Sequence, residues 1–278
     1  MVAVIVQIAT ARARQARSRG ETYNAVMHSR NALWYTVAIL VLARQKETLW
    51  SVGTGWQKVR HGMLFSDFKR IAVNADGSRT WKVEFQVTKT VQNDASTMLF
   101  EGGVLDSGLH FEKQLALHAD MLSWAGFGDV FGAHFPLFGD RNKPGTHLAS
   151  ADAIVDYIDK PCPAGYAWPM GGYSWQMAEF GYELGTVPHI SGHSFRKGGA
   201  NALRDALVAQ GRSRGEIIEY LMKFGRWKSA ESLAHYLAFT WQQLAASGQS
   251  LASSVQRAAC SITAQTYDIA RDYAQRSQ

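Results

Sequence analysis

The chain has 278 residues, of which 46% are hydrophobic, so it can bury one large core or two small ones and is not disordered throughout. Lys and Arg number 29 against 23 Asp and Glu, and the net charge of +6 permits a polyanionic partner without proving one. The two cysteines, Cys162 and Cys260, exclude a disulfide framework and lack metal-ligand spacing, which favours a reducing compartment.

The chain begins with a basic stretch, which we expect to form an N-terminal extension over residues 1–24. It holds Arg12, Arg14, Arg17 and Arg19, and no acidic residue occurs among the first 20. This composition is typical of an organelle transit peptide and equally of a basic helix that meets nucleic acid.

Charge is segregated along the chain. Residues 1–70 hold 11 Lys and Arg against 3 Asp and Glu, residues 91–160 hold 4 against 10, and residues 191–240 hold 8 against 4. The two basic stretches either build one positive face for a phosphate backbone or are solvated helix surface.

A long helix and a β-hairpin are the next predicted elements. The helix is expected near residues 22–50, because residues 32–43 are the longest apolar run and fall well short of the roughly 20 that a membrane span needs. Strands are predicted at 67–74 and 81–90, joined by a turn at 75–78, since apolar and polar residues alternate along the second strand.

The rest of the chain is predicted to be mostly helical. Ser213 and Glu216 have the spacing of a capping box at a helix start. Residues 126–148 and 161–185 are rich in Gly, Pro and aromatic residues, which indicates long loops or insertions. The fold class is therefore mainly α with a small antiparallel β hairpin or sheet. The helices are expected near 108–125, 194–210, 214–223, 229–245 and 250–275.

Chemistry-bearing residues gather in the last third of the chain. His193 and Arg196 are three residues apart near a helix start, so their side chains share one side of it, and the glycines that follow allow another backbone to approach. Trp227 and Tyr236 come about thirty residues later. Arg, His and Trp donate hydrogen bonds that suit a phosphoryl group, and Tyr supplies a nucleophilic oxygen.

These motifs resemble those of the tyrosine recombinases, the phage-integrase family that includes mobile-element members. The segment from His193 to Arg196, followed by Lys-Gly-Gly-Ala, is similar to the family's H-x-x-R box. The later G-x-W-x8-Y pattern, with Trp227 and Tyr236, is similar to the box that ends in the nucleophilic tyrosine. No core-binding domain of the family is recognised ahead of residue 25.

Two further site residues follow from the resemblance. Arg44, at the end of an apolar helix, matches the family's first arginine with Glu47 as its structural partner, and Arg60 is a rival candidate. Lys89 matches the lysine of the hairpin, with Lys82 as its rival. Each of the six candidates has an ordinary structural role as its alternative. Arg44 would cap a helix and Lys89 would end a strand. His193 and Arg196 would form a structural pair, and Trp227 and Tyr236 would serve only in packing.

The resemblance implies site-specific cleavage and rejoining of double-stranded DNA. Tyr236 would attack a phosphate and form a 3′-phosphotyrosyl bond. That phosphate would be held by Arg44, Arg196, His193 and Trp227. Lys89 would protonate the leaving 5′ oxygen. No metal, cofactor or ATP is required. The resemblance also implies the family's catalytic-domain fold over residues 25–245, with a divergent region at 91–188. A C-terminal helix or tail would follow at 246–278. It would dock either on a neighbouring subunit in a homo-oligomer or on its own domain.

Three alternatives remain open at this point. The first is a catalytically impaired DNA-binding remnant of a mobile-element recombinase, the second a type IB topoisomerase-like enzyme, and the third an unrelated helical binding protein. None of these involves a membrane. The expected location is cytoplasmic for a prokaryotic or phage protein and nuclear for a eukaryotic one, without secretion.

Overall fold

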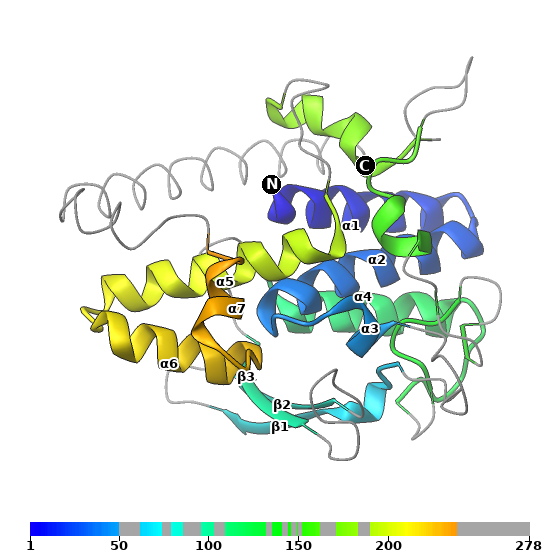
Figure 1. Cartoon of the computed structure of the whole chain (residues 1–278). Helices are drawn as coiled ribbons and strands as arrows, with labels where there is room; N and C mark the ends of the chain where they lie inside the picture. The colour runs from blue at the N-terminus through cyan, green and yellow to red at the C-terminus, as the bar shows by residue number, and fades with distance from the viewer. Residues whose placement is uncertain are drawn as a thin grey trace, which may run out of the picture.

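The computed structural model describes residues 1–49, 62–73, 79–85, 96–102, 109–131, 135–140, 144–145, 149, 152–161, 171–182 and 190–237. It confirms a mainly helical fold with a small antiparallel sheet (Figure 1). The helices are α1 (Val2–Ser18), α2 (Thr22–Leu40), α3 (Gln45–Thr48), α4 (Phe111–Trp124), α5 (Gly192–Ala209), α6 (Arg214–Gly225) and α7 (Ala230–Ala234). The strands are β1 (Phe68–Val73), β2 (Arg79–Phe85) and β3 (Ser96–Glu101), and shorter helical turns are η1 (Phe65–Asp67), η2 (Asp152–Asp156) and η4 (Tyr173–Phe180).

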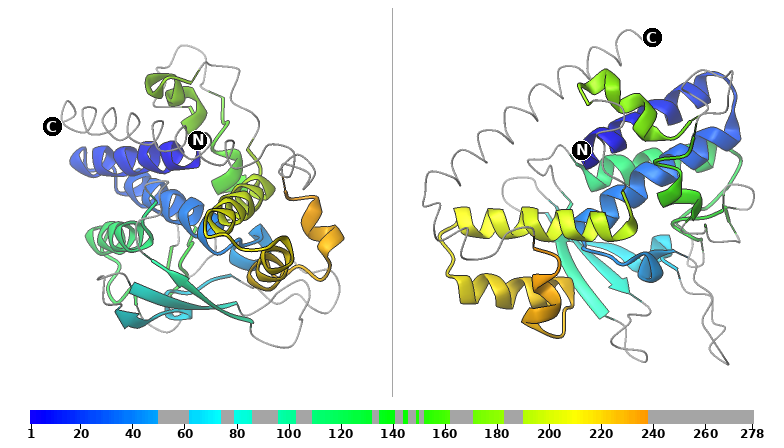
Figure 2. Two further views of the ribbon diagram at one scale, coloured as in Figure 1. Left: turned by 90° about the vertical axis from the view of Figure 1, so that its left-hand side faces the viewer. Right: turned by 45° about the horizontal axis from the view of Figure 1, so that its top comes forward.

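Two hydrophobic cores meet at the end of α2. The larger core lies among α1, α2, α4 and the sheet, and the smaller one lies among α5, α6 and α7. Figure 2 shows the sheet on the opposite side of α2 from α1, with α5 and α6 beside the helical layer. Leu42, just after α2, belongs to the smaller core, so this short segment connects the two.

The first residues, which the sequence analysis assigns to a basic extension over 1–24, are part of the folded body. Residues 2–18 form α1, whose Val4, Ile5, Ile8 and Ala9 are buried against the larger core. Arg12 is buried as well, and its Nε donates to Oε1 of Gln176 at 3.1 Å. Although this segment is rich in arginine, its apolar residues form a stripe along the helix. Burial of that stripe determines how α1 packs.

The predicted helix over 22–50 is interrupted. α2 ends at Leu40, Leu42 has a positive φ of 47°, and Gln45 begins the separate short helix α3. A leucine in this left-handed region breaks the run of α-helical hydrogen bonds. Arg44 therefore lies at the N-cap of α3 and not at the end of a continuous helix.

The predicted hairpin is two strands of a three-stranded sheet in the order β1-β2-β3. Lys82 on β2 lies opposite Lys69 on one side and Leu99 on the other. The third strand was not predicted, because its consecutive Met98, Leu99 and Phe100 hide the period of two: Leu99 is exposed while its neighbours are buried. The predicted turn at 75–78, residues 86–90 and the tail at 246–278 lie outside the described residues.

In the regions predicted as loops, the structure describes one further helix. η4, over Tyr173–Phe180, packs on α1 and buries Tyr173, Gln176 and Met177. The abundance of Gly and aromatic residues at 161–185 predicted a loop. In η4, however, the aromatic residues Tyr173 and Phe180 are buried in the larger core. No helix in the described part of the chain is long and apolar enough to cross a membrane.

α5 approaches the end of α2 closely at Gly199. A Cβ atom at this position would lie 2.4 Å from the carbonyl oxygen of Ile39 and 2.4 Å from Cδ2 of Leu42. The neighbouring Gly198 has space, since a Cβ there would meet only Cδ1 of Ile39 at 3.9 Å. Of the two glycines, therefore, the second is the one that permits the close approach expected from the sequence.

We expect Gly199→Ala to destabilise the protein and Gly198→Ala to leave it unchanged or slightly more stable. Overpacking against a backbone carbonyl costs about 1–3 kcal/mol, whereas replacing a helical Gly by Ala without a clash gains about 0.5–1 kcal/mol. Urea denaturation of the two variants measures the difference. Equal effects of both substitutions would contradict the close contact between α5 and α2.

Candidate active site

The first turn of α5 is held in place by aromatic packing. The ring of Phe195 stacks on Tyr35 at 5.2 Å between centroids and meets the edge of Trp34 at 5.3 Å. Because Phe195 is fixed in the larger core, Arg196 beside it lies against the end of α2 and the start of the smaller core. Local packing thus positions the H-x-x-R segment.

Arg196 is buried, with 1% of its surface exposed. Its two amino groups donate to the carbonyl oxygens of Leu42 and Gly225, and its guanidinium carbon lies 4.0 Å from the centroid of the Trp227 ring. Burial, helped by the nearby charges of Arg44 and Arg226, lowers the pKa of Arg196 to about 9. The group therefore keeps its positive charge at neutral pH and contributes a cation–π contact.

Three aromatic side chains meet beside this guanidinium. Trp227 contacts Tyr236 edge-on at 5.1 Å between centroids, and the Arg196 guanidinium lies 5.6 Å from the Tyr236 ring. The Tyr236 hydroxyl lies 3.2 Å from Nδ1 of His193, which is hydrogen-bonding distance. Asn201 holds the same segment from α5, since its Nδ2 donates to the Tyr236 carbonyl at 2.9 Å. The structure thus brings His193, Arg196, Trp227 and Tyr236 together.

Arg44 joins this group through a buried carboxylate. Glu47 accepts from Arg44 at 2.7 Å, as expected for its structural partner, and from Arg226 at 2.9 Å. Burial alone raises the pKa of the Glu47 carboxyl, but Arg226 and Arg44 outweigh it and hold that pKa below its ordinary value. Among the described residues, three arginines surround this one carboxylate, so the cluster carries excess positive charge.

Arg226 was missed in the sequence. It caps α6 in the left-handed conformation, with φ 59°, and its guanidinium carbon lies 4.1 Å from the Phe85 ring centroid on β2. Left-handed backbone at a residue other than Gly, Asn or Asp is uncommon and concentrates at functional sites. The only local signal was an arginine immediately before Trp227, which the motif treats as a variable position.

Three buried N–H groups in this cluster have no hydrogen-bond partner among the described residues. They are Nε of Arg196, Nε of Arg226 and Nε1 of Trp227. Each such group costs about 1–3 kcal/mol, so three in adjacent side chains is an unusual concentration.

The remaining predicted residues are placed differently. Lys89 and its neighbours lie outside the described residues, as does Arg60. Lys82 lies on β2 and pairs with Glu84 at 2.6 Å. Tyr220 is exposed on α6 and stacks on Phe224 at 5.9 Å. No group of His, Cys, Asp and Glu suited to a metal ion occurs within the described ranges.

We expect Glu47→Gln to cost about 3–5 kcal/mol of the free energy of unfolding, because it leaves buried Arg226 without its counter-charge. Chemical denaturation measures this loss. Glu216→Gln is the matched control: Glu216 pairs with Arg212 at 3.6 Å, but both side chains are 56% exposed, so we expect a much smaller change. Similar losses in the two variants would show that the Glu47 carboxylate is solvated.

Comparison with known proteins gives no family for this chain: no family model and no curated protein matches it.

Proposed function

We propose that the protein cleaves and rejoins DNA strands through a 3′-phosphotyrosyl intermediate, with Tyr236 as the nucleophile. The observation that carries this proposal is the contact of the Tyr236 hydroxyl with Nδ1 of His193 at 3.2 Å, beside a cluster of arginines. A tyrosine needs a base to take its proton and positive charge to stabilise the developing phosphorane. His193 lies at hydrogen-bonding distance from this hydroxyl, and the Arg196 guanidinium lies 5.6 Å from the centroid of the ring that carries it.

The unpartnered donors support a phosphate as the bound group. A phosphodiester offers two non-bridging oxygens, and Nε of Arg196, Nε of Arg226 and Nε1 of Trp227 are N–H groups without acceptors among the described residues. Arg44, whose side chain is 19% exposed, adds a charge that approaching DNA can reach. Arginine suits this task because its donors match the geometry of phosphate.

The reaction proceeds as an in-line displacement. The Tyr236 oxygen bonds to the scissile phosphorus while its proton passes to Nδ1 of His193. The bond from phosphorus to the 5′ oxygen breaks, and that oxygen leaves as a hydroxyl after taking a proton, for which the resemblance assigns Lys89. The phosphotyrosyl diester retains the bond energy, so attack by another strand's 5′-hydroxyl rejoins DNA and restores the tyrosine.

One observation favours a second candidate, a DNA-binding protein that has lost strand cleavage. The amino groups of Arg196 are both engaged by backbone carbonyls, and the side chain is buried. A guanidinium used in this way supports the junction of the two cores. In this alternative, Arg44 and the other basic residues bind DNA without chemistry.

Incubation of the purified protein with negatively supercoiled plasmid at low salt separates these candidates. We expect a protein–DNA adduct that survives denaturation and is removed by protease. Salt-sensitive binding without an adduct would favour the DNA-binding protein. Relaxation of plasmids of any sequence, without joining of defined sites, would favour the topoisomerase alternative. Absence of both binding and adduct would overturn the proposal.

A further inference from the structure

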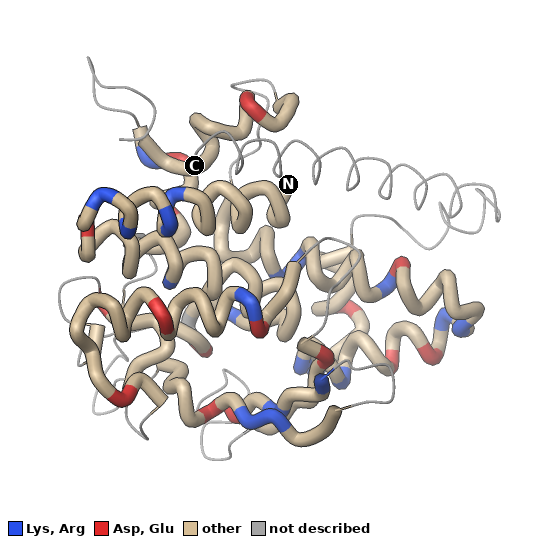
Figure 3. Tube along the Cα trace, turned by 180° about the vertical axis from the view of Figure 1, so that it is seen from behind, with Lys and Arg blue, Asp and Glu red and all other residues tan. Residues whose placement is uncertain are grey.

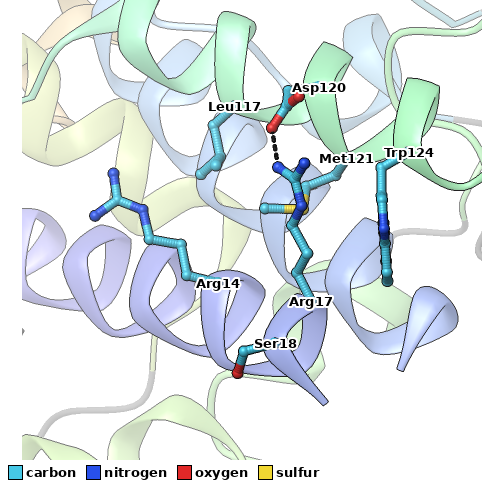
Figure 4. A pocket seen from close by; sticks show the side chains of 7 residues that line it. All are labelled: Arg14, Arg17, Ser18, Leu117, Asp120, Met121 and Trp124. Carbon is cyan, nitrogen blue, oxygen red and sulfur yellow. Dashed lines mark hydrogen bonds and ion pairs between the residues drawn. The ribbon is translucent and has the colours of Figure 1, made fainter. Parts of the chain in front are cut away.

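A second candidate site lies between α1 and α4, and none of its lining residues belongs to the site around Tyr236. It is a pocket of about 560 Å³. From α1 it is lined by Arg14, Arg17 and Ser18. From α4 it is lined by Leu117, Asp120, Met121 and Trp124. Figure 4 shows Arg14 at one end, Trp124 at the other, and Arg17 with Asp120 between them.

The pocket follows from how the two helices run. Oγ1 of Thr10 donates to Oε1 of Gln114 at 3.2 Å, and Arg17 pairs with Asp120. Because both pairs follow the same order along the chain, α1 and α4 run in the same direction. These side chains bridge the space between the two helices. Residues 14, 17 and 18 share one face of α1, and residues 117, 120, 121 and 124 share one face of α4, because each set has helical spacing. The groove is therefore a regular feature of both helices.

Its chemistry combines the charge of Arg14 with a partly exposed indole, that of Trp124, over one face of which the Arg17 guanidinium lies. Arg14 makes no hydrogen bond or ion pair with any described residue. Arg17 lies 5.8 Å from the Trp124 ring centroid, and Trp124 is 37% exposed. Figure 3 shows that the basic residues of α1 gather in its C-terminal half, away from those around α6 and α7. Asp120, the single carboxylate lining the pocket, is already paired with Arg17.

We propose that this pocket binds a segment of single-stranded nucleic acid. One phosphate contacts Arg14 and Arg17, and a neighbouring base stacks on Trp124. Basic side chains beside exposed aromatic rings are the usual means of holding unpaired nucleotides, because every base has a π-face. An acidic peptide would satisfy the arginines equally but would leave the indole face without a use. The inference rests on the pocket alone and not on the strand-cleavage chemistry.

Fluorescence anisotropy of a labelled oligothymidylate with the full chain tests the proposal. We expect Trp124→Leu to weaken binding about tenfold, since a base–aromatic stack contributes about 1–3 kcal/mol. Arg14→Gln should weaken binding and reduce the slope of log K against log salt by about 0.7, the value for one phosphate contact on a single strand. Thermal melting of each variant verifies that it is folded.

Matched controls make the result specific. Trp175→Leu removes a comparably exposed tryptophan, 41% against 37%, and Arg212→Gln removes an exposed arginine elsewhere. Neither should change binding, because neither residue lines the pocket between α1 and α4. A blunt duplex is expected to bind at the proposed cleavage site, and Trp124→Leu should not weaken its binding. Equal losses in the controls, an equal loss of duplex binding in Trp124→Leu, or equally strong competition by polyglutamate would overturn the proposal.

Discussion

Tyr236→Phe is expected to abolish the covalent protein–DNA adduct while DNA binding stays within about twofold of the original. The substitution removes only the hydroxyl oxygen that forms the phosphotyrosyl bond. The aromatic ring remains, so its contacts with Trp227 and with the Arg196 guanidinium are retained. No other group at this position can replace the nucleophile, and the expected loss is therefore complete rather than partial.

Tyr220→Phe provides the matched control for the nucleophile. Tyr220 lies on α6, a helix of the smaller core, where it is 48% exposed and its ring stacks on Phe224. Denaturing gel electrophoresis with labelled DNA should show the adduct in this variant and not in Tyr236→Phe. An adduct that persists in Tyr236→Phe and disappears in Tyr220→Phe would reassign the nucleophile.

Acidification is expected to produce the largest loss of stability. His28 and His118 are buried in the larger core, where His28 contacts the Tyr173 hydroxyl at 2.8 Å and His118 contacts the Ser29 hydroxyl at 2.9 Å. Burial lowers the pKa of each from 6.5 to about 3, and the positive charge of Arg30 contributes in both cases. Both imidazoles are therefore neutral in the folded protein at neutral pH.

The direction of the pH effect follows from these pKa values. Between pH 6.5 and pH 3 the unfolded chain binds more protons than the folded one, so stability is complete above pH 6.5 and falls as the pH is lowered. Each histidine loses about 1.4 kcal/mol per pH unit, which gives roughly 5 kcal/mol for the pair at pH 4.5. Native domains are stable by only about 5–15 kcal/mol, so this loss brings the protein close to unfolding.

Urea denaturation at pH 7.5, 6, 5 and 4.5, followed by tryptophan fluorescence, measures this dependence. His118→Gln should reduce the slope by about half, because one titrating group remains. The lowered pKa of Glu47 places its own contribution below pH 4.5, outside this range. A free energy of unfolding that stays constant from pH 7.5 to pH 4.5 would show that the two histidines are accessible to protons in the folded state.

Features that depend on neighbouring residues were predictable from the sequence. The alternation along β2 is confirmed, with Val83 and Phe85 buried. The capping box at the start of α6 is confirmed too, since Ser213 donates its backbone N–H to Glu216 at 2.8 Å. Both patterns are set within a few residues, because a strand has a period of two and a helix start leaves N–H groups that need nearby acceptors.

The site residues were predictable only where a motif contained them. His193, Arg196, Trp227 and Tyr236 could be selected from two short segments, and the structure places them in contact. The role of Lys89 and the DNA chemistry of the whole cluster stay predictions. The arrangement around Glu47 had no local signal, although Glu47 itself was expected to partner Arg44.

By itself the sequence determined the helical class, the pair of strands and the short segments that contain His193, Arg196, Trp227 and Tyr236. Only the tertiary structure placed α1 in the core, added β3 to the sheet and joined Arg226 to Glu47. These two residues are 179 positions apart, and nothing in the local sequence of either one specifies the other. Their contact exists because burial of two apolar cores brings the end of α2 against the end of α6, and a buried arginine there requires a carboxylate.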